Sequence, residues 1–215
     1  MIKIFKKIFR YTYKAIFTKY DVFIEKEVRG YKTLLDVGCG TNSPVQSFNK
    51  RIRCVGVDAF QPSIETSKSK KIHDEYHLLN VMDINKQFAS EKFDVVTALD
   101  LIEHLTKEDG FQLMDKMEAI AKHKIIIYTP NGFVPQGDRE KNPWQVHLSG
   151  WSPKEFEDRG YKVYGINGIK PLRGEYAKVK YKPAFFWNFI SDLTEPFVKN
   201  KPEKAFQILA IKTKS

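Results

Sequence analysis

Apolar and polar residues follow two alternating patterns along most of this chain, and these patterns predict strands and helices in turn. Short apolar runs rich in β-branched residues predict five strands, at 33–37, 51–57, 75–81, 93–99 and 124–129. The stretches between them are polar or amphipathic, and in 107–121 apolar side chains recur at helical spacing. Strands that alternate with helices indicate βαβ units and a mainly parallel α/β sheet.

The last third of the chain predicts a short helix and two further strands. The helix covers 152–160, with Ser152 as its N-cap and Glu155 completing a capping box. The strands are predicted at 161–166 and 206–212. With the five strands above, this pattern predicts one α/β domain over residues 31–215.

A long insertion, residues 167–204, separates the last two predicted strands and contains four prolines. It also carries an aromatic cluster made of Phe185, Phe186, Trp187 and Phe189. An insertion of this length in a compact domain is typical of a lid or a binding element.

Residues 1–30 precede this domain and predict two basic amphipathic helices, at 1–20 and 21–29. In residues 1–20, large apolar side chains are interspersed with Lys and Arg. A helix of this kind can lie in the interface of an anionic membrane, or it can pack its apolar stripe on its own domain. The sequence leaves both interpretations open.

The composition restricts the partners and the location of this chain of 215 residues. Its formal net charge of +10 favours an anionic partner, such as nucleic acid, an acidic membrane surface or an acidic substrate, although a Lys-rich solvated surface explains it equally well. Two cysteines are too few for a disulfide framework. No apolar run approaches the roughly 20 residues that span a bilayer. The expected location is cytoplasmic, with peripheral attachment at the inner membrane face if residues 1–20 bind lipid.

The first strand runs into a glycine-rich turn, Gly38-Cys39-Gly40-Thr41-Asn42. A strand, such a turn and a following helix bind anions or nucleotides, because backbone N–H groups point at the ligand. A third glycine at the spacing of the dinucleotide fingerprint would stand at position 43, which is Ser43. This departure counts against NAD or FAD as the ligand.

Three acidic residues at the ends of successive predicted strands indicate a different nucleotide. Asp36 suits a ligand that brings a cationic amino group to the turn, as S-adenosylmethionine does. Asp58, followed by Ala59, lies about twenty residues past the glycines, where an acid accepts both ribose hydroxyls. Asp83 is placed to accept the adenine amino group while Met82 packs on the ring. Together they predict an adenosyl pocket.

With these motifs, residues 33 to about 166 resemble the class I (Rossmann-like) S-adenosylmethionine-dependent methyltransferases of the broad small-molecule type. Asn42 departs from the pattern, since many relatives carry a further glycine there. The resemblance implies a doubly wound, seven-stranded, mostly parallel sheet with helices on both faces, whose last strand is antiparallel and lies beside the fifth. It also implies that S-adenosylhomocysteine is the product. The matching stretches are 34–40, 56–58, 93–96, 101–105, 128–131, 151–156 and 160–161.

In this family the loop after the fourth strand borders the methyl donor, which implies cofactor contacts for Asp100, Leu101 and His104. His104 and His147 are the candidate general bases, and His147 is the better one. For each, the alternative is a structural, hydrogen-bonded histidine. Asp100, Glu103 and His104 are also metal-ligand types, but no second cluster in the sequence supports them, so the predicted site contains no metal.

The function predicted from these residues is methylation of an O or N atom of a small-molecule, lipid-linked or glycan-linked metabolite. The basic helix and the aromatic insertion favour an acceptor at the membrane face. One alternative is an RNA-directed methyltransferase that uses the basic surface. Base amino-group methyltransferases carry an Asp/Asn-Pro-Pro-aromatic tetrad, whereas residues 100–103 read Asp-Leu-Ile-Glu, which counts against nucleic acid. The other alternative is a non-catalytic, membrane-associated module that binds the cofactor; the intact turn and its acids count against lost binding.

Overall fold

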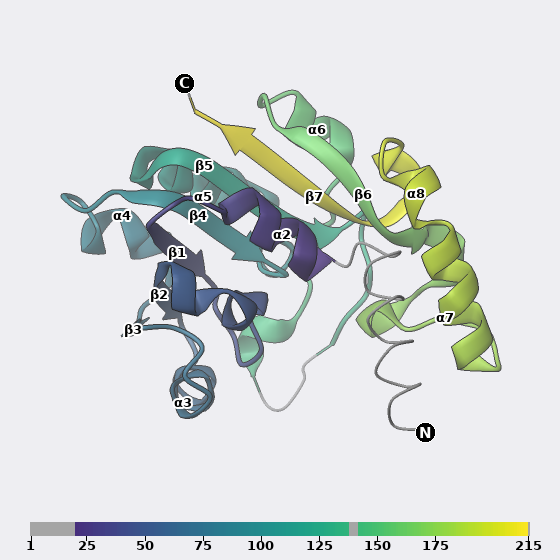
Figure 1. Cartoon of the computed structure of the whole chain (residues 1–215), viewed down its shortest axis with the longest axis horizontal. Coiled ribbons are helices and arrows are strands. Elements are labelled where there is room, and N and C mark those ends of the chain that lie inside the picture. The colour runs from purple at the N-terminus through teal and green to yellow at the C-terminus, as the bar shows by residue number, and fades with distance from the viewer. Residues whose placement is uncertain (1–19, 138–141, 215) are drawn as a thin grey trace.

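The structure is a computed structural model that describes residues 20–137 and 142–214. Its centre is a seven-stranded sheet in the order β3-β2-β1-β4-β5-β7-β6 (Figure 1). Strands β1 to β5 pair in parallel, whereas β7 is antiparallel to both β5 and β6. The predicted sheet, with its antiparallel last strand inserted beside the fifth, is confirmed. The strands are β1 (Thr33–Val37), β2 (Arg53–Asp58), β3 (Glu75–Leu78), β4 (Phe93–Leu99), β5 (Ala121–Pro130), β6 (Lys162–Ile169) and β7 (Ala205–Thr213).

Helices cover both faces of the sheet, because alternate strand residues are buried on each side. Leu35 of β1 packs in one core with Met114 of α5 and Phe156 of α6. Leu34, its neighbour, packs in a second core with Ile24 of α2. The helices are α2 (Tyr20–Val28), α3 (Gln61–Ser69), α4 (Ile84–Gln87), α5 (Lys107–Ile120), α6 (Pro153–Glu157), α7 (Ala184–Leu193) and α8 (Glu195–Val198).

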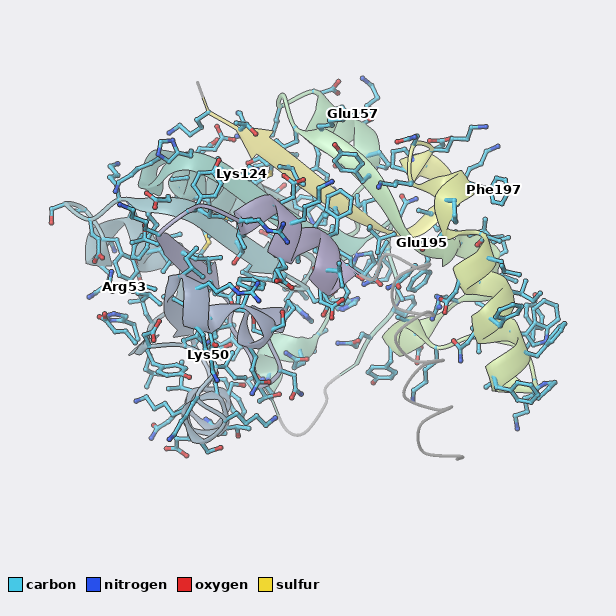
Figure 2. All side chains as sticks on the ribbon, in the orientation of Figure 1. Lys50, Arg53, Lys124, Glu157, Glu195 and Phe197 are labelled. Atoms are coloured by element: carbon cyan, nitrogen blue, oxygen red, sulfur yellow. The ribbon has the colours of Figure 1, made fainter. Side chains whose placement is uncertain are left out.

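Helix α2 is joined to the sheet by an ion pair as well as by its apolar side. Lys124 lies on β5 (Figure 2), and its Nζ atom is 2.8 Å from Oε2 of Glu27. Tyr20, the first described residue, stacks on Tyr128 of β5 with ring centroids 4.5 Å apart. The predicted helix at 1–20 lies outside the described residues except for Tyr20. Among the residues that the structure describes, no helix is long and apolar enough to cross a membrane.

The third strand is shorter than the sequence predicts, since β3 ends at Leu78 rather than at residue 81. The side chain of Asn80 accepts a hydrogen bond from the backbone N–H of Met82 (2.9 Å) and caps a 3-10 turn, Val81–Asp83. Asparagine favours such caps over a strand ladder, which explains the early end. Met82 and Asp83 therefore lie in a turn beyond the strand and not at its end.

The predicted insertion, 167–204, begins with the last residues of β6 and contains the helices α7 and α8. Both helices pack beside β6, at the edge of the sheet opposite β3 (Figure 1). The capping box predicted for Ser152 and Glu155 is present at the start of α6.

Candidate active site

The glycine turn follows β1 at the edge where the carboxyl ends of three parallel strands meet. Val37 is in register with Val57 of β2 and Ala98 of β4. Gly38 and Gly40 have φ values of 70° and 53°, in the left-handed region that favours glycine. A Cβ atom on Gly38 would lie 2.6 Å from Cδ1 of Leu101. The loop after β4 therefore packs directly on the turn, as the resemblance implies.

Asp58 holds this turn against the end of β2. Its Oδ2 atom accepts a hydrogen bond from the Gly40 N–H (2.9 Å), and its Oδ1 atom accepts one from the Phe60 N–H (2.8 Å). Burial raises the pKa of Asp58, although these backbone donors oppose the rise. A carboxylate has about four lone-pair sites, so acceptor capacity remains for a ligand hydroxyl. Ala59 follows it and is half-buried.

Asp36 lies beneath the turn with its carboxylate only 1% exposed. Oδ2 accepts from Ser43 Oγ (2.6 Å) and lies 2.9 Å from His73 Nε2, and Oδ1 accepts from Thr97 Oγ1 (2.8 Å). Three protein donors thus enclose the carboxylate that was predicted to bind a ligand amino group. The sequence predicts no role for His73, because its contact with Asp36 joins residues that are 37 positions apart.

The remaining predicted donor-site residues lie around this edge in different environments. Burial raises the pKa of the Cys39 thiol, which therefore stays protonated. Asn42 is exposed, and its Oδ1 accepts from Lys70 Nζ (2.7 Å). Met82 packs against the core, and Asp83 pairs with Lys86 (2.7 Å).

Asp100 has a strained backbone, with φ at 51°, and begins the loop after β4. Its backbone N–H donates to the Tyr128 carbonyl oxygen (2.8 Å), and its Oδ1 accepts from Gln207 Nε2 (3.1 Å). The carboxylate reaches a cavity, where desolvation by the surrounding protein raises its pKa to about 7. At neutral pH this group therefore carries a proton part of the time.

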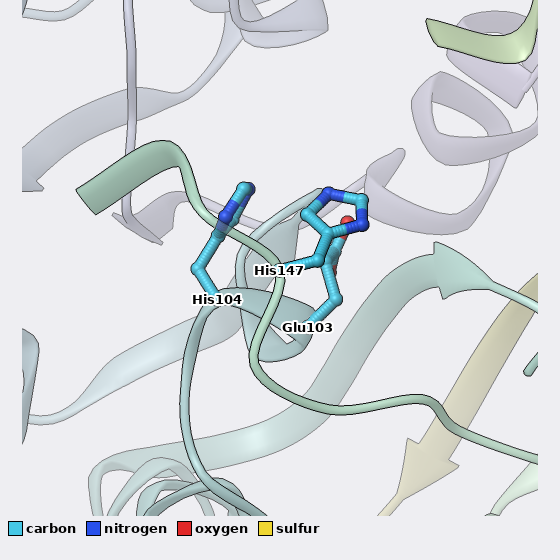
Figure 3. A group of neighbouring side chains, drawn as sticks. All are labelled: Glu103, His104 and His147. Carbon is cyan, nitrogen blue, oxygen red and sulfur yellow. The ribbon is translucent and has the colours of Figure 1, made fainter. Parts of the chain in front are cut away.

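Glu103, His104 and His147 form a cluster at the same cavity (Figure 3). One ligand-type atom from each of the three lies within 4.8 Å of the others. His104 Nδ1 lies 3.2 Å from the Val146 carbonyl oxygen, and His147 Nδ1 lies 2.6 Å from that of Val134. A carbonyl oxygen only accepts, so the Nδ1 atom carries the hydrogen in both rings, and in a neutral ring the lone pair lies on Nε2.

The electrostatics of the cluster favour uncharged imidazoles. Burial lowers the pKa of His104 to about 4, and it also lowers the pKa of His147. Burial and the nearby Asp100 raise the pKa of Glu103, whose Oε2 accepts from Thr129 Oγ1 (2.9 Å). Two neutral imidazoles and one carboxyl group are ligands that suit a divalent cation. The sequence predicts a site without metal, because no second cluster of ligand types accompanies Asp100, Glu103 and His104.

Backbone hydrogen bonds fix His147 beside Glu103. The N–H groups of Leu148 and Ser149 both donate to the Glu103 carbonyl oxygen, at 2.8 and 3.0 Å. The Trp151 indole donates to the carbonyl oxygen of Ile102 (3.3 Å). The loop that carries His147 is thus tied to the loop after β4.

The cavity beside the cluster has a volume of about 330 Å³. A second hollow of about 190 Å³ lies against the glycine turn and Phe60, and Gln145 lines both. The turn side and the cluster side of the site are therefore neighbours. The far wall of the larger cavity is formed by Tyr20, Tyr128, Asn167, Tyr176, Ala177 and Gln207.

A family model described as "Methyltransferase domain" matches residues 35–128. A small RNA 2'-O-methyltransferase of Tetrahymena thermophila is 24% identical over 181 residues, which cover 68% of this chain and 43% of the relative. A ubiquinone biosynthesis O-methyltransferase of Rickettsia bellii is 28% identical over 137 residues, which cover 58% of this chain and 52% of the relative. The chain thus spans about half the length of these relatives or less.

The fold has solved counterparts as well. An S-adenosylmethionine-dependent methyltransferase from Archaeoglobus fulgidus superposes with a TM-score of 0.57 at 18% identity, covering 95% of this chain and 99% of that one. The sheet order, the glycine turn and the matching domain agree with this likeness. Residues 35–128 therefore match the methyltransferase domain family, and the chain as a whole has the Rossmann-like fold of the class I methyltransferases that use S-adenosylmethionine.

Proposed function

We propose that the chain transfers the methyl group of S-adenosylmethionine to an oxygen atom of a small-molecule, lipid-linked or glycan-linked acceptor. The observation that carries this proposal is the Glu103, His104 and His147 cluster at a cavity that adjoins the glycine turn. Both curated relatives are O-methyltransferases by name, which favours oxygen over nitrogen as the methylated atom.

In this proposal, the donor side of the site binds and orients S-adenosylmethionine. The acceptor oxygen attacks the methyl carbon, the carbon–sulfur bond breaks, and its electron pair stays on sulfur as S-adenosylhomocysteine forms. The leaving group needs no proton, so correct alignment of donor and acceptor is the main contribution of the protein. Gly38, Gly40 and Asp58 form the donor cradle, and Asp36 holds the turn from below. A direct contact between Asp36 and the donor amino group stays a prediction.

The acceptor side removes a proton from the hydroxyl. His147 is the base in this proposal, because its Nε2 lone pair is free and its imidazole is neutral. His104 has the more strongly lowered pKa, about 4, and is therefore the weaker base. It contacts the His147 ring at a centroid distance of 4.7 Å and orients it.

A divalent cation at the same cluster is the second candidate for activating the hydroxyl. The observation that favours it is the pair of Nδ1–carbonyl hydrogen bonds, since metal-bound histidines typically donate their other N–H in this way. Glu103, His104 and His147 would hold the cation, and a bound cation would lower the pKa of the acceptor hydroxyl.

The test compares His147→Ala with His123→Ala, an exposed histidine at the start of β5. Each variant receives deuterium-labelled methyl donor and a panel of phenols, sugars and extracted lipids, and mass spectrometry measures label transfer. We expect His147→Ala to lose roughly 100-fold in rate while still binding S-adenosylhomocysteine. Loss of activity in EDTA, restored by Mn²⁺ or Mg²⁺, would assign the cation; insensitivity would assign the base. An unchanged rate in His147→Ala contradicts both.

Two alternatives use the same domain differently. An RNA-directed activity draws support from the 24% identical relative and from the +10 charge, and label transfer to RNA in the same assay would favour it. A cofactor-binding module without catalysis would bind the donor and label no acceptor. Cytoplasmic location and membrane attachment through residues 1–20 stay predictions.

A further inference from the structure

Helices α7 and α8 carry an exposed apolar surface, made of Phe185, Phe186, Leu193 and Phe197. Phe185 and Phe197 are 78% and 75% exposed, and the other two are each more than 40% exposed. Figure 2 places Phe197 at the outer edge of the molecule. Exposed apolar side chains on two helices that pack together are typical of a site for a protein partner or a membrane.

Basic residues outnumber acidic residues in the segment that carries this apolar surface. Residues 170–204 contain eight Lys and Arg against four Asp and Glu. Two of the four acids face inward: Asp192 pairs with Arg173 (3.4 Å), and Glu195 Oε2 accepts from the Gly168 N–H (2.7 Å). The exposed charged residues of this segment are therefore mostly lysines. We call five of them the lysine rim: Lys178, Lys180, Lys182, Lys201 and Lys204.

The apolar surface is rigidly connected to the cavity wall through Arg173. Its Nε donates to the Asn167 carbonyl oxygen (3.0 Å) and to Ser191 Oγ of α7 (2.9 Å). Its Nη1 donates to the Ala177 carbonyl oxygen (2.8 Å). Asn167 and Ala177 line the 330 Å³ cavity. A ligand on α7 would therefore lie close to the wall of this cavity.

We propose that this apolar surface docks on an anionic lipid bilayer and that the acceptor reaches the cavity from the bilayer. Phenylalanines enter the headgroup region while the surrounding lysines contact anionic headgroups, which is how interfacial helices bind. The proposal that the acceptor comes from the bilayer rests on the proposed function. The proposal that the surface docks on lipid does not depend on it.

The positive charge of this region favours an anionic bilayer, rather than a second copy of the chain, as the partner of the apolar surface. Two copies that met through this surface would bring their lysine rims together within a protein of net charge +10. Like charges facing one another disfavour such contact. Anionic headgroups complement the same rim.

The test is flotation of the full chain with vesicles of phosphatidylcholine, with or without phosphatidylglycerol, and without methyl donor. The variant Phe185→Ser/Phe197→Ser removes the most exposed apolar groups. Leu78→Ser, equally apolar and 55% exposed on β3 at the opposite sheet edge, is its matched control. A second pair compares Lys180→Glu/Lys182→Glu with Lys50→Glu/Lys71→Glu, whose lysines are exposed elsewhere.

We expect the wild type and both controls to float with the anionic vesicles only. The double-serine variant should lose about tenfold or more in bound fraction, and the Lys180/Lys182 variant should lose the preference for phosphatidylglycerol. Absence of wild-type flotation overturns the proposal, as does flotation of the double-serine variant like the wild type. A concentration-dependent dimer lost in that variant, without flotation, would assign the surface to self-association. Vesicle binding is measured without turnover, so its failure and failure of methyl transfer are separate results.

Discussion

His73 Nε2 lies 2.9 Å from Asp36 Oδ2, and both side chains are closed to solvent beneath the glycine turn. The pair joins the loop before β3 to the end of β1. It supplies one of the three donors that enclose the carboxylate. His73 Nδ1 is 3.4 Å from Ser67 Oγ, so the histidine is held from its other side as well.

Replacing His73 should therefore weaken both the fold and donor binding. His73→Leu leaves Asp36 buried with two donors, which we expect to cost about 1–3 kcal/mol of unfolding free energy. The turn above should loosen, so affinity for S-adenosylhomocysteine should fall too. Urea denaturation and titration calorimetry measure the two effects, with exposed His123→Leu as the control. Wild-type values for both quantities in His73→Leu would rule out this role.

Asp100 should make stability depend on pH in a direction opposite to that of a paired carboxylate. Its folded-state pKa, about 7, lies above the unfolded value, so the folded protein holds the proton more tightly. Its stabilising contribution is present at low pH and is lost as the pH rises through about 7. Asp100→Asn, whose amide oxygen still accepts from Gln207, should raise the melting temperature more at pH 8 than at pH 5. A pH-independent difference, or one larger at pH 5, would refute this; exposed Glu157→Gln is the control.

Gly110→Ala reverses the usual effect of removing a glycine from a helix. Alanine normally adds about 1 kcal/mol in a helix interior. A Cβ on Gly110 in α5, however, would overlap the buried ring of Trp151. Overpacking costs about 1–3 kcal/mol, so we expect net destabilisation in chemical denaturation. Gln112→Ala, exposed on the same helix, should change little. A more stable Gly110→Ala protein would contradict this expectation. It would show that the Trp151 ring, and the loop that carries His147, can shift to make room for the added methyl group.

The sequence pattern predicts the central sheet well because its parallel strands are buried on both faces. The bounds of β1 and β4 match the prediction to the residue. Prediction is less accurate where a side chain competes with the strand ladder, as Asn80 does after β3. The helices of the insertion, α7 and α8, are not predicted from the sequence, which shows this stretch only as a proline-containing insertion with an aromatic cluster.

The glycine-turn side of the candidate site is predictable to the extent that its contacts are local in the sequence. Gly38, Gly40 and Asp58 follow from spacing along two neighbouring strands, and the structure brings them together. The contacts of His73 with Asp36 and of His147 with Glu103 join loops that are far apart in the sequence and that the sheet brings together. A pattern of residue types along one sequence contains no information on such contacts.

Binding of S-adenosylhomocysteine by titration calorimetry tests the central claim most directly. We expect saturable one-to-one binding by the wild type. Asp58→Ala removes the carboxylate that accepts from Gly40 and Phe60, and it should bind at least about tenfold more weakly while remaining folded by circular dichroism. No binding by the wild type, or equal binding by the folded variant, would contradict the assignment of the donor site.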